Sequence, residues 1–110
     1  MKLESPLDNL TNEKRRFGVF AIDHRDSLRA FVRPDAPDSL TAAEITALKD
    51  QMVRAIGPEA TGVMLEPEYS IPQLIESGAV PRGVGFTAAL EAQGYLGDPE
   101  KGPTTLLDGW

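Results

Sequence analysis

The residues of this chain best suited to chemistry are Asp23, His24, Arg25 and Asp26, which follow an apolar run at residues 17–22. Ionisable side chains at the carboxyl end of a buried strand are typical of a site at the mouth of an α/β sheet or barrel. Asp23 offers an acid/base or substrate-orienting carboxylate. The planar guanidinium of Arg25 suits a phosphate or carboxylate ligand. A purely structural role stays open, in which the two aspartates cap the next helix and Arg25 pairs with them.

His24 is the only histidine of the chain. A lone histidine is more often a structural hydrogen-bonding residue than a catalyst, so its position between Asp23 and Arg25 supports two interpretations. In one it contacts a substrate, and in the other it supports the local fold.

A second cluster of this kind contains Glu66 and Glu68, which follow an apolar run at residues 62–65 and flank Pro67. Their carboxylates could contact a substrate hydroxyl or a metal ion, or could serve only the turn. A metal site built from both glutamates with Asp23 and His24 is the weaker alternative. We expect no metal.

The elements that must position these residues follow from apolar periodicity and from proline and glycine. Thr41 and Glu44 fit a capping box, which predicts a helix over 41–56. Its apolar face is predicted to contain Ile45, Leu48, Met52 and Ile56, and Gly57-Pro58 ends it. The further expected elements are a tail or short helix in 1–16, strands at 17–23 and 62–65, and short helices at 26–31, capped by Asp26, and 73–77.

Residues 83–91 fit either a strand or the start of a helix. Val84, Phe86 and Thr87, with the glycines at 83 and 85, favour a strand, whereas residues 88–91 favour a helix. A loop is expected at 97–103, and residues 104–110 read as the start of another element. Strands that alternate with helices predict an α/β fold with a parallel sheet. Residues 17–110 show no convincing domain boundary.

Composition excludes several classes of function. The 110 residues carry a net charge of −6 and no cysteine, which argues against nucleic-acid binding, disulfides and thiolate metal sites. No apolar stretch is long enough to span a membrane, and no secretory signal is evident, so we expect a cytoplasmic protein. The segment at 83–88 lacks the glycine pattern of a dinucleotide or phosphate loop, and no cofactor is expected.

Three ordered segments resemble the class I tagatose-1,6-bisphosphate aldolases. Residues 20–28 (Phe-Ala-Ile-Asp-His-Arg-Asp-Ser-Leu) resemble their Ala-Phe-Asp-Gln-Arg-Gly-Ala-Leu segment. Residues 63–72 (Val-Met-Leu-Glu-Pro-Glu-Tyr-Ser-Ile-Pro) and 90–95 (Leu-Glu-Ala-Gln-Gly-Tyr) are similar to two later segments of the family. The first segment is also similar to that of the sulfofructosephosphate aldolases.

The resemblance implies the amino-terminal βα units of a (β/α)8 TIM barrel and the cleavage of a ketose phosphate to dihydroxyacetone phosphate and an aldehyde, through a Schiff base on lysine. It implies that Asp23 is catalytic and that His24, Arg25, Glu66 and Glu91 contact a phosphorylated sugar. It also makes residues 85–91 a strand that ends at Glu91. His24 replaces a glutamine of the family, and Glu66 replaces an aspartate.

A closed barrel of this type needs about 250 residues, so this chain holds roughly the first three of eight strands. None of its four lysines is predicted to end a buried strand, and Lys49 falls on the helix 41–56. We therefore expect the Schiff-base lysine to lie elsewhere and the chain alone to be inactive. The alternative is a non-catalytic fragment or degenerate relative that acts through self-association, as a homo-oligomer, or through a partner.

Overall fold

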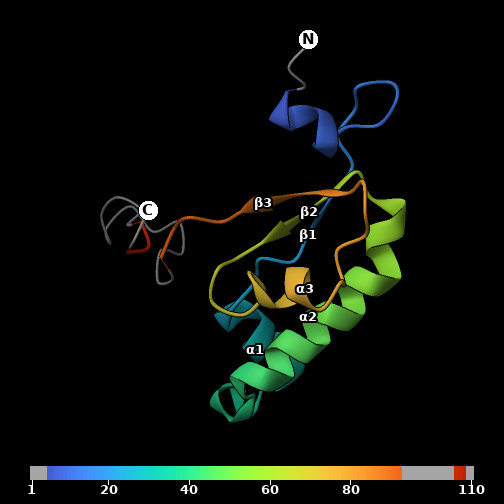
Figure 1. The fold of residues 1–110 in the computed structure, drawn as a ribbon. Coiled ribbons are helices and arrows are strands. Elements are labelled where there is room, and N and C mark those ends of the chain that lie inside the picture. The colour runs from blue at the N-terminus through green and yellow to red at the C-terminus, as the bar shows by residue number, and fades with distance from the viewer. Residues whose placement is uncertain (1–4, 93–105, 109–110) are drawn as a thin grey trace.

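The computed structural model describes residues 5–92 and 106–108. Its centre is a sheet of three parallel strands, β1 (Val19–Ala21), β2 (Gly62–Leu65) and β3 (Gly85–Ala88), in the order β1-β2-β3 (Figure 1). Because the strands are parallel, their carboxyl ends share one edge of the sheet. The α/β class with a parallel sheet is confirmed, and β2 has the predicted bounds.

The longest helix, α2 (Ala42–Ile56), begins with the predicted capping box, in which Thr41 and Glu44 accept each other's backbone N–H groups. Its fully buried stripe consists of Ile45, Lys49 and Val53. The predicted face was therefore wrong in one respect, because Ile56 is 42% exposed at the end of the helix and a lysine is buried instead.

Two shorter helices, α1 (Asp26–Val32) and α3 (Gln73–Glu76), confirm the predicted helical segments to within a residue. Asp26 is the first residue of α1 rather than its cap, and Arg25 occupies the cap position without a capping side-chain hydrogen bond. The main core lies where α2 and α3 cover one face of the sheet. It contains Ile22, Val53, Val63, Leu65, Leu74 and Ala79.

The described residues also form three 3-10 helices: η1 (Pro6–Leu10), η2 (Pro37–Ser39) and η3 (Gly57–Glu59). The helical segment of the amino-terminal region is shorter than predicted, because Thr11 leaves it to bridge with Phe17. Leu10 is buried against Gly62 and Gly85. Gly62 alternates with Val63 along β2, so Leu10 lies on the sheet face opposite the helices.

The apolar run at residues 17–22 does not alternate, which predicts a strand buried on both faces, and this prediction was wrong. Val19 and Ala21 are exposed, because β1 is an edge strand and no described element covers them on the face opposite the helices. The strand is also shorter than predicted, although the backbone N–H of Ile22 still donates to Met64.

The third segment is a strand, so the helical alternative was wrong. It ends at Ala88, three residues before the predicted end, and Glu91 forms an isolated bridge with Leu106. The loop predicted at 97–103 lies outside the described residues, as does most of the element predicted at 104–110. No helix within the described ranges is both long and apolar enough to cross a membrane.

Candidate functional site at the carboxyl edge of the sheet

Arg25 joins all three strand ends. Its Nη1 donates to Oε1 of Glu68 at 2.9 Å, after β2, and its Nη2 donates to the backbone carbonyl of Glu91 at 2.9 Å, after β3. The Arg25 side chain is only 7% exposed. The structure thus brings the three strand ends together at one edge of the sheet through one guanidinium.

The guanidinium of Arg25 is bonded to the protein itself rather than left open for a ligand. Both ends of its guanidinium fork contact protein oxygens, and Glu91 takes part through its backbone rather than through its carboxylate. The predicted substrate contacts of Arg25 and Glu91 remain predictions. What the structure describes for Arg25 is a clamp between strands.

Glu66 lies directly after β2 and forms a buried ion pair with Lys49 of α2. Nζ of Lys49 lies 2.7 Å from Oε1 of Glu66, and both side chains are fully buried. Burial lowers the pKa of Lys49, while the carboxylate of Glu66 and the more distant charge of Asp23 oppose this effect. Such a pair stays charged only when nearly all its polar atoms are bonded.

The remaining polar atoms of Glu66 shape the turn that follows β2. Its Oε2 accepts the backbone N–H groups of Glu68 at 2.7 Å and Tyr69 at 3.0 Å. The Ser70 hydroxyl accepts the backbone N–H of Glu66 and lies 2.8 Å from its carbonyl oxygen. The turn is therefore built around the Glu66 carboxylate, which faces the protein rather than solvent.

Asp23 and His24 are the predicted site residues most open to a ligand. Asp23 is half-buried and His24 is exposed, and within the described ranges neither side chain has a hydrogen bond or ion pair. Carboxylate and imidazole together can accept, donate and transfer protons. They are accessible polar groups beside three buried charged side chains, those of Arg25, Lys49 and Glu66, which form the frame of the site.

Tyr69 connects this frame to α1. The Arg29 guanidinium donates to the Tyr69 hydroxyl at 3.1 Å and lies 5.6 Å from its ring centre, while Lys49 Nζ lies 5.9 Å from the same ring. Arg29 also donates to the backbone carbonyl of Leu40. One aromatic ring thus lies between two cations from different helices.

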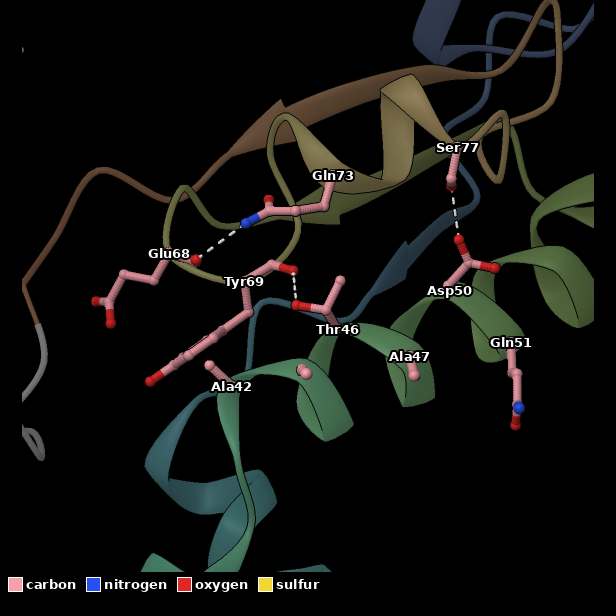
Figure 2. Close-up of a pocket in the computed structure, with 10 residues that line it drawn as sticks. Ala42, Thr46, Ala47, Asp50, Gln51, Glu68, Tyr69, Gln73 and Ser77 are labelled. Carbon is pink, nitrogen blue, oxygen red and sulfur yellow. Dashed lines mark hydrogen bonds between the residues drawn. The ribbon is translucent and has the colours of Figure 1, made fainter.

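A groove of about 700 Å³ lies on the outer side of this frame, between α2 and α3 (Figure 2). Hydrogen bonds hold its walls together, from Thr46 to the Tyr69 carbonyl at 2.7 Å and from Ser77 to Asp50 at 2.6 Å. Its floor includes small side chains of α2, among them Ala42 and Ala47. None of the five predicted site residues lines it.

The metal alternative has no support in the described part of the chain, where no three His, Asp or Glu side chains are grouped to hold an ion. Glu66 faces Lys49, and Glu68 faces Arg25. The two glutamates are thus each paired with a cation.

Sequence reasoning missed Lys49, because a lysine within a helix normally marks the solvent face. Two signals were present. Lys49 lies four residues from both Ile45 and Val53, on the buried stripe, and a strand end with an acidic residue follows the helix. A lysine on such a stripe needs a buried carboxylate partner.

Comparison with curated proteins yields tagatose 1,6-diphosphate aldolases. The chain is 25% identical over 104 residues to that of Streptococcus agalactiae and 31% identical over 105 residues to tagatose 1,6-diphosphate aldolase 1 of Enterococcus faecalis, covering 94% of this chain in both cases. It is 27% identical over 89 residues to that of Staphylococcus aureus, which covers 81% of the chain. These matches cover 31%, 30% and 26% of the relatives' own lengths. No family model matches the chain.

Proposed function

We propose that this chain carries the first three strand ends of a class I aldolase site that acts on a phosphorylated ketose, as in a (β/α)8 barrel. The strongest support is that the order of the matching segments along the chain agrees with the order of the strands in the sheet. Three segments resemble the aldolase family in sequence order, and the strands that overlap or directly precede them are parallel neighbours in the same order.

In this proposal Asp23 is the catalytic or substrate-orienting carboxylate and His24 contacts the substrate beside it. Both lie at the carboxyl edge, where barrels of this type bind their ligands. Arg25 holds the three strand ends together, Glu66 supports the turn after β2, and Glu91 completes the wall of the site.

We do not assign the nucleophile of the Schiff-base reaction to any of the described residues. Lys49 is fully buried and bonded to Glu66, and Lys14 is exposed in the turn that precedes β1, whereas the candidate site follows that strand. A Schiff base needs an uncharged amine that reaches the substrate carbonyl. We therefore expect the 110-residue chain to bind a ketose phosphate fragment without cleaving the parent sugar.

Binding can be measured through His24, because a single histidine gives one unambiguous set of imidazole NMR signals. Titration with dihydroxyacetone phosphate should shift these signals in the wild-type chain. Asp23→Asn should weaken binding by about tenfold, the equivalent of one hydrogen bond to a charged group. The matched change Asp35→Asn, on an exposed residue between α1 and η2, should leave binding unchanged.

The lysine prediction has its own test. Borohydride treatment in the presence of dihydroxyacetone phosphate, followed by mass spectrometry, should leave the chain without a covalent adduct. An adduct on any of its lysines would show that the nucleophile is present. An absence of His24 shifts at millimolar ligand would remove the support for a phosphate-sugar site in this chain.

The second candidate function is self-association, which exposed apolar side chains on and beside the two edge strands of the sheet favour. Phe86 of β3 is 45% exposed, Val19 of β1 is 37% exposed, and Phe17 before β1 is 60% exposed. Strand edges of this kind can pair with another chain. Light scattering should detect dimers or larger species, and Phe86→Lys should reduce them. A dispersed wild-type monomer at high concentration would contradict this function.

A further inference from the structure

The Lys49–Glu66 pair has no surface on which a ligand could be bound. Both side chains are fully buried, and a ligand at the carboxyl edge meets Asp23 and His24 first. Any influence of the pair on that edge must therefore pass through other residues.

The route runs through the two oxygens of the Glu66 carboxylate. Oε1 is 2.7 Å from Lys49 Nζ and 3.0 Å from the Ser70 hydroxyl, which orients the carboxylate. Oε2 accepts the backbone N–H groups of the next residues in the turn, Glu68 and Tyr69. The helix α2 is thus connected through one carboxylate to two consecutive peptide groups.

Those two residues contact the segment that follows β1, at the cap position of α1 and within that helix. Glu68 accepts from Arg25, and Tyr69 accepts from Arg29. A rotation of the Glu66 carboxylate would release both backbone N–H groups and would displace both side-chain acceptors. Because Arg25 also holds the carbonyl of Glu91, the displacement would extend to the third strand end.

We propose that Glu66 is a positioning residue of the strand-end site. Its carboxylate sets the turn 66–70 and through it the Arg25 clamp, while Lys49 stabilises the buried charge of Glu66. Glu66 then acts on a ligand without touching it. The ligand-binding part of this proposal rests on the proposed function, whereas the structural part does not.

The test compares two double variants that both remove the buried charges. Lys49→Met/Glu66→Gln keeps an amide oxygen that can accept from the turn, and Lys49→Met/Glu66→Leu removes the acceptor. Circular dichroism first establishes that each variant is folded. Hydrogen exchange then follows the backbone amides of Glu68 and Tyr69, with the α2 amides as an internal reference.

We expect the Gln variant to protect the two amides as the wild type does, and the Leu variant to lose that protection while the α2 amides remain slow. A purely stabilising pair would instead change exchange in all regions together. We also expect the Leu variant to bind dihydroxyacetone phosphate at least about tenfold more weakly than the Gln variant, as the loss of oriented hydrogen bonds requires.

Equal protection and equal binding in the two folded variants would overturn the proposal. If the wild-type chain binds no dihydroxyacetone phosphate, the proposed function fails, and exchange at Glu68 and Tyr69 still decides the positioning role. If the Leu variant does not fold, hydrogen exchange of the wild-type chain alone tests the positioning role. Exchange of its Glu68 and Tyr69 amides at the rate of an unstructured peptide would disprove the positioning role, whereas slow exchange there supports it.

Discussion

The backbone of Asn9 lies directly against Gly85. A Cβ atom at Gly85 would lie 2.6 Å from the carbonyl oxygen of Asn9 and 2.8 Å from the Leu10 side chain. The amino-terminal 3-10 helix η1 can therefore approach β3 only because position 85 has no side chain.

Gly85→Ala should destabilise the chain by about 1–3 kcal/mol, the usual cost of overpacking, because a carbonyl oxygen cannot move as a side chain can. Gly18→Ala is the matched control, since its Cβ would lie no closer than 3.7 Å to other atoms and should change stability by less than about 0.5 kcal/mol. Urea unfolding measures both. Equal midpoints for the two variants would show that η1 does not hold this position.

Lys49→Met alone should be among the most damaging single substitutions. It leaves the Glu66 carboxylate buried without its cation, which costs about 3–5 kcal/mol in comparable buried pairs. Lys14→Met, on an exposed lysine, is the control and should be nearly neutral. Thermal unfolding measures the difference, and a Lys49→Met chain as stable as the control would indicate that the pair is not buried in solution.

Arg25→Lys should lose one of the two contacts of the guanidinium fork, because an ammonium group cannot span Glu68 and the Glu91 carbonyl in the same geometry. We expect a loss of about 1.5–3 kcal/mol, the value of a hydrogen bond to a charged group. Arg33→Lys, in the half-exposed pair with Glu44, should cost less than about 1 kcal/mol. Chemical denaturation distinguishes the two, and a larger loss for Arg33→Lys would contradict the clamp.

Stability should fall as the pH is lowered through the titration of Asp50 and Glu44. Hydrogen bonds from Arg54 and Ser77 lower the pKa of Asp50, and those from the Thr41 backbone and Arg33 lower the pKa of Glu44. A carboxylate with a lowered folded-state pKa stabilises the fold above its ordinary pKa of about 4, and this contribution disappears as the pH falls through the folded-state pKa.

The double variant Asp50→Asn/Glu44→Gln should therefore be less stable than the wild type at pH 7, and the difference should shrink between about pH 5 and pH 2. Glu59→Gln, on an exposed residue of η3, is the control for removal of one surface charge. Urea midpoints across this pH range provide the measurement. A constant difference between wild type and double variant would mean that these two carboxylates are not bonded as described.

Local signals predicted most of the elements. The capping box at Thr41 and Glu44 located the start of α2, and Gly57-Pro58 located its end. Glycines and an apolar run located β2. These features depend on residues close together in the sequence, so pattern reasoning can find them.

The location of the candidate site could be predicted from the sequence, but the contacts between its residues could not. Parallel strand ends must share an edge, which brought Arg25 near Glu68 and Glu91. Which oxygen each guanidinium nitrogen would meet depends on separations of 43 and 66 residues in the chain. The burial of Lys49 likewise depends on how α2 rotates against the sheet.

The order β1-β2-β3 in the sheet is also the order in which the strands are synthesised. Each strand therefore needs only its immediate predecessor as a template, and β2 can pair with β1 before β3 has left the ribosome. Arg25 is synthesised before its two acceptors, Glu68 and the carbonyl of Glu91, which follow the second and third strands. The clamp can be complete only when the third strand end is present, so the contact of Arg25 with the Glu91 carbonyl reports that this strand end is in place.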